Sequence, residues 1–296
     1  MEKRVLVTGA NGQLGKSLQK IAGQKGKDCK FFFTDVDTLD ITMRDDIAAF
    51  VKAHGVNVIV NVAAYTAVDK AEEEVEKAYL LNQTAVANLA AVAAATDAFL
   101  VHISTDYVFD GQAVTPYSEE MVPNPVSVYG KSKWAGEQAM IQSGCRGVII
   151  RTAWLYSPYG NNFVKTMLRL ASSHSEINVV DDQIGCPTSA DDLAEVIMLL
   201  IAHSSTAKNL EIYHFANKGE ISWYDFACEI MKLAHKKCKV NPIATKDYPS
   251  KVQRPAYSVF NLSKVEDSLN YMIPDWNESL KRNMPEIIYN FEHDIK

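Results

Sequence analysis

The sequence predicts an α/β fold, built on a doubly wound parallel sheet with a smaller, partly interleaved α/β lobe. Three observations support this prediction. Short apolar runs alternate with helical patterns through the first half of the chain, a glycine-rich turn joins the first run to the first helix, and the alternation weakens after about residue 155. Buried strands that alternate with helices form parallel sheets that are covered on both faces.

The first half of the chain supplies the expected sheet. The strands are short apolar runs, at residues 5–7, 31–33, 56–62, 99–103 and 147–151. The helices have amphipathic or alanine-rich patterns, at residues 16–22, 44–54, 78–95 and 128–142. Because the carboxyl ends of parallel strands lie at one edge of the sheet, a ligand is expected at that edge.

The segment between the first strand and the first helix contains Gly9, Gly12 and Gly15. Glycine permits a tight turn and a close approach of backbone to a pyrophosphate, and the helix N-terminus offers free N–H groups. The spacing is GxxGxxG, so a plain strand–helix turn is the alternative. We expect a Rossmann-type dinucleotide site, with cofactor contacts from Gly9, Asn11, Gly12, Gln13, Leu14 and Gly15.

Asp35 follows the expected second strand, 20 positions after Gly15 (35 − 15). A carboxylate there accepts hydrogen bonds from the adenosine ribose and favours NADH over NADPH, with a helix cap or turn residue as the alternative. Lys3, Arg4 and Lys30 are candidates for contact with a 2′-phosphate, so either NADPH or NADH is expected. Further cofactor contacts are predicted at Asp40, Ile41, Ala63, Ala64 and Tyr65.

The second half of the chain is less regular. Helical patterns at residues 163–172, 191–203 and 224–234 are separated by longer polar loops. We expect residues 1–155 to form the dinucleotide-binding domain. Residues 156–296 are expected to form mainly a substrate-binding lobe, with some segments returning to the first domain.

Composition excludes several classes of protein. The formal net charge is −6 without a basic run, so nucleic acid is not an expected partner. The longest apolar stretch, residues 196–202, is far shorter than the ~20 residues of a membrane span. The cysteines are scattered without a CxxC spacing, which favours reduced thiols in the cytoplasm. The histidines show no ligand spacing, and no metal is expected.

Tyr129 lies four residues before Lys133, in the expected helix at residues 128–142. This spacing places both side chains on one face of a helix. An ammonium near a phenol stabilises phenolate and lowers the tyrosine pKa from its usual value of roughly 10. Ser104 and Thr105 end a strand upstream, in the order that a dehydrogenase site needs. We therefore predict Thr105, Tyr129 and Lys133 as the catalytic residues.

The glycine turn, the Ser104-Thr105 pair and the Tyr129–Lys133 pair together resemble the extended short-chain dehydrogenase/reductase superfamily. Longer runs narrow the resemblance to the dTDP-4-dehydrorhamnose reductases, whose reaction is the last step of dTDP-L-rhamnose biosynthesis. These runs are residues 63–72, 104–109, 151–156 and 160–163, with Asp182-Gln183, Pro187-Thr188 and Arg254-Pro255 downstream. The resemblance extends from Val5 to about Trp276.

The resemblance implies reduction of the C4 ketone of dTDP-4-dehydro-β-L-rhamnose to dTDP-β-L-rhamnose, with NADPH or NADH as cofactor. In that reaction Tyr129 protonates the nascent alkoxide, Lys133 bonds the nicotinamide ribose and Thr105 orients the ketone. A ketone that accepts hydride develops negative charge on its oxygen, and a nearby acid and hydroxyl donor stabilise that charge. A monomer or a homodimer is expected.

The resemblance also implies contacts to the nucleotide sugar, and an arginine suits its diphosphate. The alternatives are a core position for Trp154, a surface ion pair for Arg254 and simple packing for Val68. The predicted substrate contacts are Thr66, Val68, Thr105, Asp106, Trp154, Asn162 and Arg254.

The chain departs from the resemblance at one point, and two other functions stay open. Some relatives carry an acidic residue in the first helix that helps hold magnesium at a dimer interface, where this chain has Lys16, Ser17 and Leu18. Another nucleotide-sugar ketoreductase or epimerase of the superfamily is one alternative. A 4,6-dehydratase is disfavoured, because Tyr107 rather than a second carboxylate follows Asp106. The other alternative is a non-catalytic cofactor-binding subunit, like the regulatory subunit of methionine adenosyltransferase.

Overall fold

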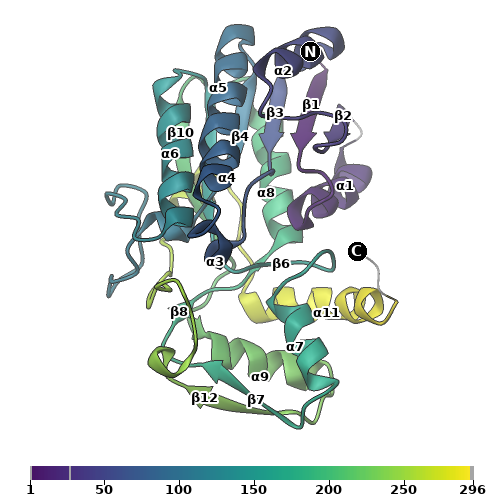
Figure 1. The fold of residues 1–296 in the computed structure, drawn as a ribbon. Helices are drawn as coiled ribbons and strands as arrows, with labels where there is room; N and C mark the ends of the chain where they lie inside the picture. The colour runs from purple at the N-terminus through teal and green to yellow at the C-terminus, as the bar shows by residue number, and fades with distance from the viewer. Residues whose placement is uncertain (1, 27, 294–296) are drawn as a thin grey trace.

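The computed structural model describes residues 2–26 and 28–293. Figure 1 shows a layered lobe built around one sheet and a smaller lobe at its lower end. Within the described residues, six parallel strands form this sheet in the order β10-β5-β4-β3-β1-β2. The doubly wound parallel fold predicted from the sequence is confirmed. The strands are β1 (Lys3–Thr8), β2 (Cys29–Thr34), β3 (Val58–Asn61), β4 (Phe99–Thr105), β5 (Gly147–Thr152) and β10 (Leu210–Phe215).

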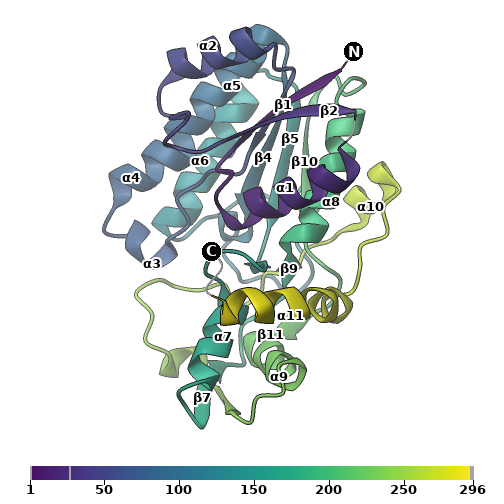
Figure 2. The same cartoon turned by 90° about the vertical axis from the view of Figure 1, so that its right-hand side faces the viewer.

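Helices cover both faces of the sheet, as the two views in Figures 1 and 2 show. One core lies under α1 (Gln13–Lys25) and α8 (Ala190–His203), and the other lies under α2 (Arg44–His54), α5 (Ala85–Thr96) and α6 (Val128–Gln142). Successive strand residues point to opposite faces, so Val5 and Val7 enter the first core and Leu6 enters the second. Both α2 and α6 have the bounds that the sequence predicts.

The helix expected at residues 78–95 is longer than predicted. The segments α4 (Val75–Tyr79), η1 (Leu80–Thr84, one π-helical turn) and α5 follow one another without a break. This run, Val75–Thr96, is long and apolar enough to span a membrane by length and composition, so the expectation that no stretch approaches such a length is wrong. The run packs against α2 and α6 in the second core, as a core helix of a layered fold does.

The smaller lobe is built mainly from the second half of the chain and has its own core around Phe226, Ile230 and Leu280. Three helices surround this core, α7 (Phe163–Ala171), α9 (Trp223–Leu233) and α11 (Trp276–Glu292). The strand pairs are β7 (Glu176–Val180) with β12 (Lys239–Ile243), β8 (Ile184–Gly185) with β11 (Ile221–Ser222), and β6 (Leu155–Tyr156) with β9 (Thr188–Ser189). The short elements are α3 (Val68–Ala71), η2 (Asp106–Val108), η3 (Thr245–Asp247) and α10 (Ser263–Leu269).

Candidate active site

The glycine turn lies at the carboxyl end of β1 and packs closely on the end of β3. Gly9 has a positive φ of 69°, and a Cβ there would lie 2.6 Å from the Ala63 backbone. A Cβ on Gly15 would lie 2.5 Å from the carbonyl oxygen of Gly9. Gly12 caps α1 without a side chain, and no acidic residue lies in the first helical turn. The N–H groups of the turn bond Thr34, Asp35 and Gly9, so the first N–H groups of α1 are the ones that fit a dinucleotide pyrophosphate.

Asp35 ties this turn to the end of β2. Its Oδ2 accepts a hydrogen bond from the Asn11 N–H at 2.9 Å, and its Oδ1 accepts one from the Val36 N–H at 2.8 Å. A carboxylate has about four acceptor positions, so both oxygens keep capacity for ribose hydroxyls. The turn role and the ribose role are therefore compatible.

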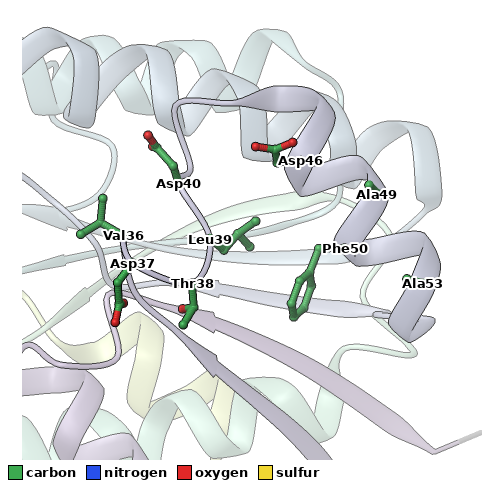
Figure 3. Close-up of a pocket in the computed structure, with 9 residues that line it drawn as sticks. All are labelled: Val36, Asp37, Thr38, Leu39, Asp40, Asp46, Ala49, Phe50 and Ala53. Atoms are coloured by element: carbon green, nitrogen blue, oxygen red, sulfur yellow. The ribbon is translucent and has the colours of Figure 1, made fainter.

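The residues after Asp35 form an open hollow of about 470 Å³ against α2, drawn in Figure 3. Asp37, Asp40 and Asp46 line it, and none of its nine lining residues is basic. Asp40 also accepts hydrogen bonds from the N–H and hydroxyl of Thr42. The adenosine end of the predicted cofactor site is thus bordered by negative charge.

The basic residues proposed for contact with a 2′-phosphate lie at the wrong edge of the sheet. Lys3 and Arg4 begin β1, and Lys30 is the second residue of β2, so all three lie at the amino ends of strands. The glycine turn lies at the opposite, carboxyl ends. The Lys3 ammonium donates to Ser204 Oγ at 2.7 Å, and the Arg4 Nε donates to the His54 carbonyl. That part of the prediction is wrong.

Two residues predicted to contact the cofactor have side chains in the cores. Leu14 of α1 is packed in the first core, and Ile41 is packed in the second. Their backbones remain on the turn and on the loop after β2. Any cofactor contact from either residue is therefore expected through the backbone.

Thr105 and Tyr129 meet at the carboxyl end of β4. Thr105 is its last residue and Tyr129 lies in the first turn of α6, where the Ser127 hydroxyl caps the helix. The Thr105 hydroxyl lies close enough to the phenol to act on the pKa of Tyr129, which it lowers. Tyr129 also packs in one apolar cluster with Tyr65 and Val68. The fold therefore gathers residues predicted for catalysis, cofactor and substrate around one phenol.

Lys133 lies one helical turn after Tyr129 and is buried. Its ammonium donates to the Ile103 carbonyl at 2.6 Å. Burial lowers the Lys133 pKa to about 8, and the negative charge of Glu137 opposes this shift. The ammonium is therefore close to its titration range at physiological pH.

The pKa expected for Tyr129 is wrong in direction. Burial raises it above its ordinary value of 10, and the carboxylate of Asp106 adds to the rise, while the Thr105 hydrogen bond opposes it. The Lys133 ammonium bonds to the backbone of β4 and does not offset this burial. Tyr129 is consequently a protonated phenol at neutral pH, which is the form that donates a proton.

Asp106 is buried directly beside these groups. Burial raises its pKa from 3.8 to about 6, and hydrogen bonds from Thr105, the local backbone and Ser258 limit the rise. The Thr105 hydroxyl donates to its Oδ1 at 2.9 Å. The Thr105 hydroxyl is thus oriented toward the Asp106 carboxylate.

The residues predicted to bind the nucleotide sugar come from several separate parts of the chain. Thr66 and Val68 lie at the start of α3, and Thr66 is exposed. Trp154 follows β5 with a positive φ of 48°, and its ring stacks on Trp223 of α9 with 3.5 Å between centroids. A Cβ on Gly185 would lie 2.7 Å from that ring. Trp154 is therefore held in a strained backbone conformation by packing on Trp223 and Gly185 of the smaller lobe.

Arg254 reaches from the smaller lobe to the sheet lobe. Its guanidinium forms an ion pair with Asp69 of α3 and donates to the Tyr107 hydroxyl at 3.0 Å. The ion pair that the sequence left as an alternative is present. The remaining guanidinium donors stay available for an anion, because arginine has five N–H groups.

Both polar atoms of the Asn162 side chain are already hydrogen-bonded. Its Oδ1 caps α7 by accepting from the Lys165 N–H at 3.1 Å, and its Nδ2 donates to Gln13 Oε1 at 3.0 Å and to the Ser157 carbonyl at 2.9 Å. Gln13 is the first residue of α1, beside the glycine turn. Asn162 therefore joins the smaller lobe to the cofactor turn, and its substrate contact stays a prediction.

Asn82 organises the site and was missed from the sequence. It is buried in the π-helical turn, where its Oδ1 accepts from the Tyr65 N–H and its Nδ2 donates to the Tyr65 carbonyl and to Ser132 Oγ. Gly136 allows this approach, because a Cβ there would lie 2.0 Å from the Asn82 carbonyl oxygen. The available signal was an asparagine in an alanine-rich helix, which carries a second one at Asn88.

A buried ion pair behind Lys133 was also missed. Glu137 follows Lys133 by one turn and bonds the Arg151 guanidinium at 2.7 Å, with both side chains almost fully buried. Arg151 also approaches His214 Nε2 at 3.4 Å. An acidic residue four positions after Lys133, the predicted catalytic lysine, was the signal in the sequence.

The first helix, considered for magnesium at Lys16, Ser17 and Leu18, carries an ion-paired lysine at residue 20. The Lys20 ammonium of α1 donates to Asp191 Oδ2 at 2.7 Å and to Glu286 Oε2 at 2.5 Å. Across residues 2–26 and 28–293, no group of three or more His, Cys, Asp or Glu side chains has the arrangement of a metal site. The absence of metal stays a prediction.

Comparison with known proteins identifies relatives along the whole chain. A family model described as the RmlD substrate binding domain matches residues 3–288. A dTDP-4-dehydrorhamnose reductase from Aggregatibacter actinomycetemcomitans is 41% identical over 286 residues, which are 94% of this chain and 97% of that protein.

Two solved structures are similar over nearly their full length. A dTDP-4-dehydrorhamnose reductase from Clostridium acetobutylicum has a TM-score of 0.90 and 44% identity, covering 95% of this chain and 98% of that one. A dTDP-4-dehydrorhamnose reductase from Bacillus anthracis in complex with NADP has a TM-score of 0.91 and 40% identity, covering 97% of this chain and 100% of that one.

Proposed function

The chain belongs to the dTDP-4-dehydrorhamnose reductase family, and from this premise we propose that it reduces the C4 ketone of dTDP-4-dehydro-β-L-rhamnose to dTDP-β-L-rhamnose. The observation that carries the proposal is the meeting of Thr105 and Tyr129 at the carboxyl end of β4, with Lys133 one turn further. The glycine turn of β1 opens at the same edge of the sheet.

The chemistry follows from the charge that develops on the C4 oxygen. A bound NADPH or NADH supplies the hydride to C4. Tyr129, held protonated by burial, gives its proton to the oxygen as the negative charge forms. On substrate binding the Thr105 hydroxyl would turn from Asp106, which accepts its single proton in this structure, and donate a hydrogen bond to the same oxygen. Two donors thereby stabilise a charge that is larger in the transition state than in the ketone.

Lys133 has a positioning and electrostatic role. In this site its ammonium would bond the nicotinamide ribose hydroxyls, in addition to its bond with the Ile103 carbonyl. Its positive charge stabilises the phenolate that Tyr129 becomes after donating its proton. Asn82 fixes the loop after β3 and the helix that carries both residues, so the geometry is set before substrate binds.

Both NADH and NADPH fit the glycine turn, and a preference for NADH is proposed. Asp35 and the carboxylates that line the neighbouring hollow oppose a 2′-phosphate by like charge. The NADP complex of the Bacillus anthracis relative shows that a member of this family binds the phosphorylated cofactor. The preference is therefore expected to be one of degree.

A cytoplasmic location and a monomeric or homodimeric state are proposed together with the function. All five cysteines are free thiols in the structure, which agrees with a reducing compartment. The nucleotide sugar is the expected small-molecule partner, and neither nucleic acid nor membrane is needed for the reaction.

Deuterium transfer tests this proposed function. The chain is incubated with dTDP-4-dehydro-β-L-rhamnose and NADH or NADPH that carries deuterium at the transferred position, and the product is examined by NMR. The reductase gives dTDP-β-L-rhamnose with deuterium at C4 and consumes one cofactor per sugar. An epimerase would give no net cofactor oxidation, and a non-catalytic subunit would bind cofactor without any turnover.

A further inference from the structure

Tyr107 contacts both lobes and the predicted catalytic acid, although the reaction assigns it no role. It lies in η2, two residues after Thr105. Its N–H donates to Thr105 Oγ1 at 3.3 Å. Its ring stands edge-on to the Tyr129 ring, with 5.4 Å between centroids and 75° between planes. One residue therefore touches the side chains of both Thr105 and Tyr129.

The position of Tyr107 is fixed by close backbone packing. A Cβ on Gly130 would lie 2.1 Å from the Tyr107 carbonyl oxygen, so α6 is in direct contact with this residue next to Tyr129. The ring belongs to the same apolar cluster as Tyr129, Tyr65 and Val68. A displacement of Tyr107 is therefore expected to displace Tyr129 as well.

The hydroxyl of Tyr107 faces the other lobe. It accepts the hydrogen bond from the Arg254 guanidinium, which also pairs with Asp69 of α3. A second ion pair, between Lys251 and Glu73 at 2.6 Å, joins the same two segments nearby. The segment of Arg254 is anchored in turn, because the Ala256 carbonyl accepts from the Ile184 N–H of β8.

We propose that Tyr107 is a positioning residue. It fixes the position of Arg254, at the diphosphate, relative to that of Tyr129, at the sugar ketone. Its hydroxyl orients the guanidinium, and its ring supports the phenol of Tyr129 from the side. The inference rests on the proposed function, because Arg254 is predicted from the resemblance to contact the diphosphate of that substrate. Binding of the nucleotide in the smaller lobe and proton donation in the sheet lobe are linked through this one side chain.

Two substitutions test the hydroxyl and the ring of Tyr107 separately. Tyr107→Phe removes the hydroxyl and keeps the ring, so Kd for dTDP and KM for the nucleotide sugar are expected to rise about tenfold, with kcat within about twofold of wild type. Tyr107→Leu also removes the edge-on ring, so kcat is expected to fall by about fivefold or more in addition. Tyr289→Phe is the matched control, because Tyr289 is exposed on α11 and touches none of these groups.

A double-substitution cycle shows whether the hydroxyl acts through Arg254. In an Arg254→Gln background, Tyr107→Phe is expected to change Kd for dTDP by less than about twofold, against about tenfold in the wild type. Titration calorimetry with dTDP, in the presence of cofactor, measures all four proteins. This cycle stands even if Tyr107→Leu fails to fold.

The outcomes are distinct. An equal effect of Tyr107→Phe in both backgrounds, or no effect in either, overturns the link to Arg254. A kcat for Tyr107→Leu equal to that of Tyr107→Phe overturns the support of Tyr129. If the wild type binds dTDP but does not reduce the keto sugar, the proposed function fails, while the dTDP cycle still decides the link to Arg254.

Discussion

The cofactor turn is predicted to bind its ligand through backbone atoms, whereas the predicted substrate residues of the smaller lobe would bind theirs through side chains. The turn at Gly9, Gly12 and Gly15 offers backbone N–H groups and requires only the absence of side chains. Asn162 and Arg254 offer side chains that already bond Gln13, Asp69 and other groups. A site made of backbone is set by local sequence, whereas a site made of side chains depends on partners far away in the chain.

The largest expected effect tests the sheet side of this comparison. Tyr129→Phe removes only the proton donor, so kcat is expected to fall by about 100-fold or more. Kd for the cofactor should change by less than about twofold, because the ring and its packing remain. Steady-state rates and cofactor titration measure the two quantities. Retained turnover would move the acid to Asp106, the other titratable group beside Thr105.

Removing the lysine charge is expected to harm two steps together. Lys133→Met should lower kcat/KM by about 100-fold and also weaken cofactor binding, because one ammonium serves the ribose and the phenolate. The same kinetic and binding measurements apply. Unchanged cofactor affinity in this variant would contradict the proposed ribose contact.

The pH dependence of cofactor affinity tests the role of the Lys133 charge. Burial lowers the Lys133 pKa from 10.5 to about 8, so the ammonium is charged below that pH and neutral above it. Cofactor affinity is therefore expected to fall as pH rises through about 8. Lys133→Arg keeps its charge over this range, so its affinity should be flat from pH 7 to 9 whatever its absolute value.

The two predicted polar residues of the smaller lobe are expected to behave differently from each other. Arg254→Gln should raise KM for the nucleotide sugar about tenfold or more, because a charged donor to the diphosphate is lost. Asn162→Ala should lower the free energy of unfolding by about 1 kcal/mol through the lost cap of α7. Chemical denaturation and sugar titration compare the variants. A large KM change with intact stability in Asn162→Ala would place that residue at the substrate.

The smallest expected effect concerns cofactor choice. Asp35→Ala should weaken NADH binding by about threefold to tenfold and leave NADPH binding nearly unchanged, because the lost ribose acceptor is offset by lost repulsion of the phosphate. Competitive binding of the two cofactors measures the ratio. Equal losses for both would mean that Asp35 acts only on the turn through Asn11.

The sequence predicts the sheet well because its elements follow local rules. The bounds of α2 and α6 match, since Gly55 follows the amphipathic pattern of α2 and Ser127 caps the start of α6. Helix α1 begins at Gln13 rather than Lys16, because Gly12 serves as its N-cap without a side chain. The strand β10, at Leu210–Phe215, was not anticipated, since its polar residues Glu211 and His214 interrupt the apolar run.

The side-chain chemistry is less predictable for a physical reason. The Tyr129–Lys133 spacing gives the shared helix face, but the pKa of the phenol depends on burial by Tyr65, Tyr107 and Val68. Asn82 likewise gains its role only when Gly136 allows α6 to approach it. Such contacts join residues that are distant in sequence, and no local pattern contains them.

A crystal structure of this chain with NADPH and dTDP-β-L-rhamnose tests the proposed mechanism most directly. We expect the sugar C4 oxygen within about 3.2 Å of both the Tyr129 and Thr105 hydroxyls, with Lys133 at the nicotinamide ribose. We also expect the diphosphate at Arg254, which keeps its bond to Tyr107. A C4 oxygen held instead by other side chains, beyond reach of Tyr129, would contradict the proposed mechanism.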